Sequence, residues 1–141
     1  MTNKNLPARD ALPEGRGNLL AWQWSAYGAA HTDRRNLLIH AVTTPLFMLG
    51  CAALPASFAF GWWLAPAGVA VISGAMLAQG RGHARESEPP APFLGPLDVL
   101  ARILAEQWIT FPRFFMSGRF FAAWRGEAPR REHLEAQPAS R

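Results

Sequence analysis

The 45 residues from 36 to 80 contain no Asp, Glu, Lys or Arg. Arg34 and Arg35 precede this uncharged run, and Arg81 and Arg85 follow it. A helix needs about 20 apolar residues, each rising about 1.5 Å, to cross a lipid bilayer. The run is therefore long enough for two spans joined by a tight turn, but not for three.

We expect a first span at about residues 36–54 and a second at about 64–80, with the turn at 55–63. The second segment is rich in Ala, Gly and Ser, which permits close packing of two helices. Because arginines at the ends of spans favour the cytoplasmic face, both termini are expected in the cytoplasm, at a bacterial inner membrane. Two buried helices of a soluble core are an alternative, since Pro or Gly interrupts each segment. A homodimer that buries more of the Gly/Ala face is a further expectation.

The segment before the uncharged run predicts a short helix at the membrane surface. In residues 18–31, Trp24, Tyr27 and His31 are spaced by three and four positions and share one helical face. Thr32–Asp33 are helix N-cap types, so a break is expected there before the first span. Aromatic rings just before a span are typical of the water–lipid boundary.

A second surface helix is expected after the spans, at residues 97–111. Asp98, Arg102 and Glu106 recur at every fourth position and predict a charged stripe with two ion pairs. Because such a stripe is costly inside a bilayer, we expect the helix on the membrane surface or against the hairpin. The arginines and aromatic residues of 112–126 indicate another interfacial segment.

The charged residues lie outside the uncharged run, with 14 Lys and Arg against 10 Asp and Glu and a net charge of +4. These arginines adjoin apolar and aromatic residues, which fits anionic lipid headgroups and argues against nucleic acid. The single cysteine, Cys51, excludes an intramolecular disulfide. The predicted fold is an all-α membrane protein, a two-span transmembrane hairpin flanked by amphipathic interfacial helices. This single domain would cover residues 18–125, between a disordered lead-in at 1–17 and a loose polar tail at 126–141.

Three histidines flank the uncharged run, and a hairpin would bring them together. A turn midway along the run places His40 opposite His83. His31 lies nine residues before His40, which on one unbroken helix is the opposite face. The break at Thr32–Asp33 allows His31 to converge on the other two. Glu86 follows His83 by three residues and shares its helical face.

Imidazole and carboxylate ligands suit iron, zinc, copper or nickel, and two or three histidines with one acid are typical of non-haem ferrous oxygenases. The candidate metal ligands are therefore His31, His40, His83 and Glu86. Each of them also has a purely structural explanation. His31 can be an interfacial ring, His40 a partner of the carbonyl freed by Pro45, His83 a helix cap, and Glu86 the partner of an arginine.

The order of short motifs resembles a known family. The motifs are Trp24-x2-Tyr27-x3-His31, Asn36-x3-His40-x4-Pro45 and Gln79-x2-Gly82-His83-x2-Glu86 followed by prolines. They resemble the small membrane proteins typified by the fungal 2-hydroxy fatty acid dioxygenase, named for metabolism of phytosphingosine to odd-numbered fatty acids. The resemblance covers about residues 20–115. This chain has room for two spans, whereas many relatives carry more.

The resemblance implies an iron(II)-dependent enzyme that uses dioxygen to shorten a 2-hydroxy fatty acid by one carbon. It implies His31, His40 and His83 as the catalytic histidines. Four arginines are candidates to hold the substrate carboxylate: Arg34, Arg35, Arg81 and Arg85. Two alternatives stay open: a non-enzymatic membrane hairpin that binds lipid or recruits a partner, and a zinc-dependent lipid ester hydrolase at the same site.

Overall fold

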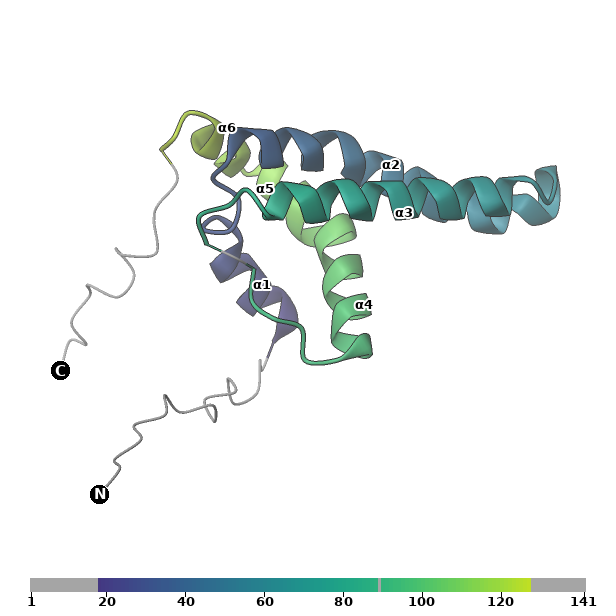
Figure 1. Ribbon diagram of the computed structural model, residues 1–141, viewed down its shortest axis with the longest axis horizontal. Helices are drawn as coiled ribbons and strands as arrows, with labels where there is room; N and C mark the ends of the chain where they lie inside the picture. Colours follow the sequence, from purple (N-terminus) through teal and green to yellow (C-terminus); the bar gives the residue numbers. More distant parts are fainter. Residues whose placement is uncertain (1–17, 89, 128–141) are drawn as a thin grey trace, which may run out of the picture.

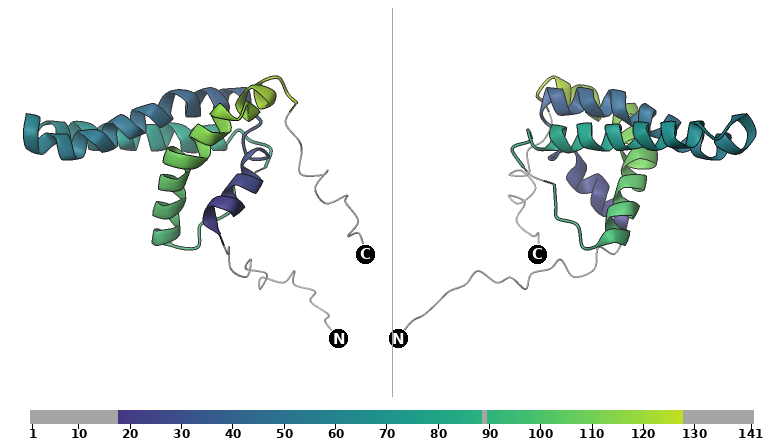
Figure 2. Two further views of the ribbon diagram at one scale, coloured as in Figure 1. Left: turned by 180° about the vertical axis from the view of Figure 1, so that it is seen from behind. Right: turned by 45° about the vertical axis from the view of Figure 1, so that its right-hand side comes forward.

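A computed structural model of the protein describes residues 18–88 and 90–127, and within them the chain is helical with no strand. Two antiparallel helices, α2 (Arg34–Phe60) and α3 (Leu64–His83), form a long hairpin (Figure 1). The far end of this hairpin projects beyond all the other helices, as the two views in Figure 2 also show. The predicted lead-in and nearly all of the predicted tail lie outside the described residues.

The break before the first long helix is confirmed, and Asp33 is its N-cap. The Asp33 carboxylate accepts hydrogen bonds from the backbone N–H groups of Arg35 and Asn36, both at 2.9 Å. Before it, α1 (Leu19–Tyr27) is a separate short helix. The predicted surface helix at 18–31 therefore ends four residues earlier than expected.

The turn of the hairpin is shorter than predicted. Helix α2 continues through Pro45 and Pro55 to Phe60, so the expected turn at 55–63 was wrong over most of its length. A proline removes one hydrogen bond of its helix, and the neighbouring turns of α2 keep theirs. Gly61 ends the helix with a φ of 127°, a conformation that a residue with a Cβ rarely adopts.

The prediction of two apolar spans is corrected to one. Among the described residues, α2 alone is long and apolar enough, by length and composition, to cross a membrane. Helix α3 is long enough but less apolar, because its C-terminal part carries polar side chains: Gln79, Arg81 and His83.

The two long helices pack closely through glycines, as the composition of the second segment predicted. A Cβ built on Gly50 would lie 2.9 Å from the Gly68 carbonyl oxygen, and one on Gly68 would lie 2.7 Å from the Gly50 carbonyl oxygen. Neither position tolerates a side chain without separating the helices. In contrast, nothing lies within 4 Å of a Cβ on Gly74.

The helix predicted at 97–111 is confirmed, and it is longer than expected. Helix α4 (Pro96–Ala105) continues into a π-helical turn, η1 (Glu106–Thr110), and then into α5 (Phe111–Met116). A last short helix, α6 (Arg119–Trp124), lies beside the start of α2 (Figure 1). The core lies at this end of the hairpin and is formed mainly by aromatic side chains: Tyr27, Leu37, Phe111, Phe114, Phe120 and Ala123.

We predict that Gly68→Ala lowers the free energy of unfolding by about 1–3 kcal/mol, because the new methyl group displaces the backbone of α2. Gly74→Ala is the matched control on the same helix and should leave stability unchanged or raise it by up to about 1 kcal/mol. Unfolding in mixed micelles of a mild detergent and dodecyl sulfate, followed by circular dichroism, measures both. Equal stabilities of the two variants would contradict the packing described above.

Candidate metal centre

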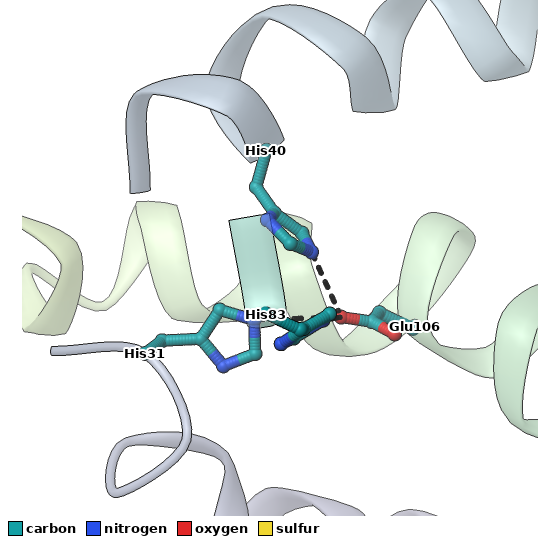
Figure 3. A group of neighbouring side chains, drawn as sticks. All are labelled: His31, His40, His83 and Glu106. Carbon is teal, nitrogen blue, oxygen red and sulfur yellow. Dashed lines mark ion pairs between the residues drawn. The ribbon is translucent and has the colours of Figure 1, made fainter. Parts of the chain in front are cut away.

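Four side chains from four different segments converge at the base of the hairpin (Figure 3). His31 comes from the turn after α1, His40 from α2, His83 from the last residue of α3, and Glu106 from the first residue of η1. Their candidate ligand atoms all lie within 4.8 Å of one another. The predicted convergence of the three histidines is therefore confirmed.

The imidazole nitrogens face one oxygen of the glutamate. The distances from Glu106 Oε1 are 3.3 Å to His40 Nε2, 3.5 Å to His31 Nε2 and 4.0 Å to His83 Nε2. His31 and His40 are almost completely buried, with 2% and 0% of their surface exposed. The centre is thus shielded from bulk water on the side of these two rings.

Hydrogen bonds to backbone carbonyls orient two of the rings. His31 Nδ1 lies 2.9 Å from the carbonyl oxygen of Tyr27, and His40 Nδ1 lies 3.1 Å from that of Asn36. Because a carbonyl oxygen only accepts, each Nδ1 carries a proton, and Nε2 is the nitrogen of each ring that faces the centre. This arrangement is typical of histidines that bind metals. The partner of His40 is thus the Asn36 carbonyl rather than the carbonyl freed by Pro45.

The centre contains acceptors that face one another without a donor between them. Nε2 of His31 and Nε2 of His40 are buried and have no hydrogen-bond partner. Glu106 Oε1, which they face, receives a hydrogen bond from the Tyr27 hydroxyl at 3.0 Å. Lone pairs held this close in a buried site are unfavourable unless a cation lies between them. The donor set therefore fits a metal ion, with iron, zinc, copper and nickel all compatible.

The surroundings of the centre shift the pKa values of three of its groups. Burial raises the pKa of Glu106, but the His31 and His40 imidazoles that face its carboxylate outweigh burial and hold that pKa well below its usual range. Burial is the main cause that lowers the pKa of His83 to about 4. Burial and the neighbouring Glu106 raise the pKa of Tyr27 well above its usual value. Near neutral pH the centre thus holds a carboxylate, a neutral His83 imidazole and a protonated phenol.

Glu86, predicted as the carboxylate ligand, lies outside this cluster. Its carboxylate accepts hydrogen bonds from the backbone N–H groups of Thr32 and Asp33 at 3.0 and 3.1 Å, and from the Asn36 amide at 2.6 Å. A carboxylate at the start of α2 is also favoured by the helix dipole. Glu86 therefore connects the end of α3 to the turn that carries His31, and Glu106 takes the position expected for it.

Glu106 was placed by the sequence on a charged stripe, as the ion-pair partner of Arg102. Of the two predicted ion pairs, the one between Asp98 and Arg102 is present, at 3.8 Å. Glu106 instead points at the histidines (Figure 3). Pro112 is the one residue of the sequence that could have indicated this change of direction. A proline lacks an N–H group, and its ring disturbs the carbonyl four residues earlier. The turn before it widens, and the N–H of Phe111 bonds to the carbonyl of Glu106, five residues back.

The four arginines predicted to hold a substrate carboxylate are exposed residues. Arg34 donates to the Trp124 carbonyl at 2.8 Å, and the side chains of Arg35, Arg81 and Arg85 are exposed. Their role toward a carboxylate stays a prediction.

A cavity of about 440 Å³ adjoins the centre, between α1, α3 and α4. His31, His83 and Glu106 line it at one end. Its remaining wall is mostly apolar and includes Trp22, Ala26, Met76, Phe93 and Ile103. The volume lies within the range of about 300–1,000 Å³ that is usual for small-molecule sites.

Arg102 lines the cavity as well and holds its wall in place. Its guanidinium group donates to the carbonyl of Ala91 at 2.9 Å and lies 4.4 Å from the centre of the Phe93 ring. These contacts attach the segment before α4 to the helix itself. The buried guanidinium group of Arg102 therefore holds this part of the cavity wall in position.

Comparison with known proteins gives no relative: no protein-family model, curated protein or solved structure matches this chain.

We predict that the purified protein binds about one divalent ion per chain and that His40→Ala abolishes this binding. Glu106→Gln keeps the shape but removes the charge, and should weaken the affinity by at least about tenfold. His133→Ala, in the part of the chain that the structure does not describe, is the matched histidine control. Elemental analysis after dialysis against a weak chelator measures the content. A His40→Ala protein with the metal content of the unsubstituted chain would exclude this centre.

Pro112→Ala should also weaken metal binding, although Pro112 is not a ligand. With an N–H restored, the π-helical turn can tighten into an α-helix, which rotates Glu106 away from the histidines. Pro96→Ala is the control, because Pro96 occupies the first turn of α4, where a proline breaks no hydrogen bond. Titration with a metal-sensitive dye compares the affinities. If Pro112→Ala binds metal as tightly as Pro96→Ala, the π-helical turn does not position Glu106.

Proposed function

We propose that this protein is a membrane-bound non-haem iron(II) dioxygenase that shortens 2-hydroxy fatty acids by one carbon. The observation that carries the proposal is the buried cluster of three imidazoles and one carboxylate. Histidine and carboxylate ligands with room for substrate are typical of ferrous oxygenases. The sequence motifs around these histidines, which resemble the 2-hydroxy fatty acid dioxygenase family, add the substrate class.

The cavity supports a ligand with a polar head and an apolar chain. Its polar end is formed by His31, His83 and Glu106, whereas Met76, Phe93 and other apolar residues line the rest. A 2-hydroxy acid would place its carboxylate and hydroxyl at the polar end and its acyl chain along the apolar wall. Burial of that chain contributes about 0.8 kcal/mol per CH₂ group.

The outer surface of the hairpin supports a location in a membrane. Only 33% of the most apolar part of α2 is buried inside the protein, whereas the core helix of a soluble protein is mostly buried. Large apolar side chains are exposed along both helices and at the turn, among them Leu49, Phe58, Trp62 and Val69. Lipid would cover this surface, and the tryptophans at the turn are suited to an interface.

Bound ferrous iron would supply the redox chemistry with dioxygen. In the overall reaction, C1 of the 2-hydroxy acid leaves as carbon dioxide, C2 becomes the new carboxyl group, and one dioxygen molecule is consumed as water forms. His31, His40, His83 and Glu106 would hold the ion. The Tyr27 hydroxyl orients Glu106, and the Tyr27 ring stacks on the His31 ring at 3.9 Å, which excludes water from that side.

We expect protein purified without oxygen and loaded with ferrous iron to convert a 2-hydroxy fatty acid to the acid one carbon shorter, with consumption of dioxygen. His31→Ala, His40→Ala and His83→Ala should each abolish the product, and His133→Ala should not. Mass spectrometry of a mixed panel of 2-hydroxy acids measures the conversion. Full activity of the three variants would refute the proposal. Bound zinc with oxygen-independent ester hydrolysis would indicate the hydrolase, and absence of any metal the non-enzymatic module.

A further inference from the structure

Helix α4 has its polar side turned inward. The Asp98 carboxylate accepts from the backbone N–H of Leu94 at 3.0 Å and pairs with Arg102. Arg102 is 91% buried against the segment before the helix, with 9% of its surface exposed, and lines the cavity together with Ile103. One turn further along the chain, at the start of η1, Glu106 points at the histidines. The charged stripe of this helix is therefore an internal surface.

The opposite side of α4, continued into η1, is an exposed apolar stripe. Its members are 82%, 55%, 40% and 49% exposed: Leu97, Leu100, Leu104 and Trp108. They are spaced by three, four and four residues, so they share one face. An angle of about 100° per residue places this face roughly opposite the cavity-lining residues Arg102 and Glu106. We call these four residues the α4 stripe.

The α4 stripe faces toward the projecting end of the hairpin. In Figure 1 and in both views of Figure 2, α4 lies between α1 and that projecting end. Because Arg102 and Ile103 line the cavity on the side of α1, the opposite side of α4 faces away from α1, toward the projecting end. The exposed apolar surface of the hairpin includes Leu46, Leu49 and Val69 on this part. Apolar side chains are therefore exposed both on the stripe and on the hairpin that projects beyond it.

We propose that the α4 stripe lies in the boundary between the headgroups and acyl chains of the bilayer that surrounds the hairpin. The occupant is lipid, because the surface joins the helix that is apolar enough to cross a membrane. The lengths agree with this placement. Beyond Thr43, which contacts Gln79 beside η1, α2 continues for the 17 residues to Phe60, a rise of about 25 Å. With α4 sunk by about 5–10 Å, this length covers a hydrocarbon core of about 30 Å.

This placement makes α4 the wall between the lipid and the metal centre. One face of the helix touches acyl chains, and the other lines the cavity. An amphiphile could then pass from the membrane to the centre without crossing water. This consequence rests on the proposed function, whereas the contact of the stripe with lipid does not.

Spin labels test the contact directly. In a Cys51→Ala background, the variants Leu97→Cys and Leu100→Cys are labelled and the full chain is reconstituted in vesicles of a neutral and an anionic phospholipid. Both labels should collide several-fold more often with dioxygen, which partitions into lipid, than with a water-soluble nickel complex. Arg85→Cys, at an exposed residue beside the end of α3, is the control and should show the reverse preference.

The contact with lipid is overturned if the labels at 97 and 100 collide with the nickel complex as often as the label at 85. It is also overturned if they show dipolar broadening that disappears on dilution with unlabelled chain, because a second copy then covers the stripe. Metal content is measured on the same samples. Absence of bound metal, together with labels that collide mainly with dioxygen, counts against the proposed function alone. Bound metal, together with labels that collide mainly with the nickel complex, counts against the membrane contact alone.

Discussion

The convergence of acceptor atoms at one buried point is the constraint on which the rest of the structure depends. Nε2 of His31 and Nε2 of His40 face Glu106 Oε1 at 3.5 and 3.3 Å, with no donor between them. A buried site lacks the water that would otherwise satisfy these atoms, so their grouping favours a bound cation. Since each ligand comes from a different segment, such an ion would join all the major helices. Metal binding and stability of the fold are therefore expected to be coupled.

Residues that are not ligands determine whether the ligands can meet. Glu86 holds the start of α2 against the end of α3 through the N–H groups of Thr32 and Asp33. At Gly82, next to His83, a Cβ would collide with Asn36 Oδ1, so a larger residue there would displace the Asn36 side chain, which donates to Glu86. The reciprocal hydrogen bonds between Gln79 and Gln107, at 3.1 and 2.7 Å, attach η1 to α3. These contacts hold the segments that carry the ligands in place, as the groups around metal ligands do in other metal sites.

The histidines could be predicted from the sequence, but their carboxylate partner could not. The meeting of His40 with His83 follows from the length of chain on either side of the turn, and the N-cap type at Asp33 located the break that frees His31. Glu86 was predicted as the carboxylate ligand because it follows His83 by three residues, and helical periodicity places two such residues on one face. Glu106 lies on another helix beyond a proline-rich link, and no periodicity predicts the path of such a link. The extension of α2 through Pro55 was missed for a related reason, since packing against α3 can override a local preference.

The inverted polarity of the helix that leads to η1 explains why Glu106 was assigned to the surface. In a water-soluble protein the charged stripe of an amphipathic helix faces solvent and the apolar stripe faces the core. Here the apolar side chains Leu97 and Leu100 face outward, while Arg102 is buried. Periodicity gives the two faces of a helix but not which face is inside, because that depends on the surrounding medium. The lipid environment proposed above would reverse the choice, and the same reversal would bring Glu106 to the histidines.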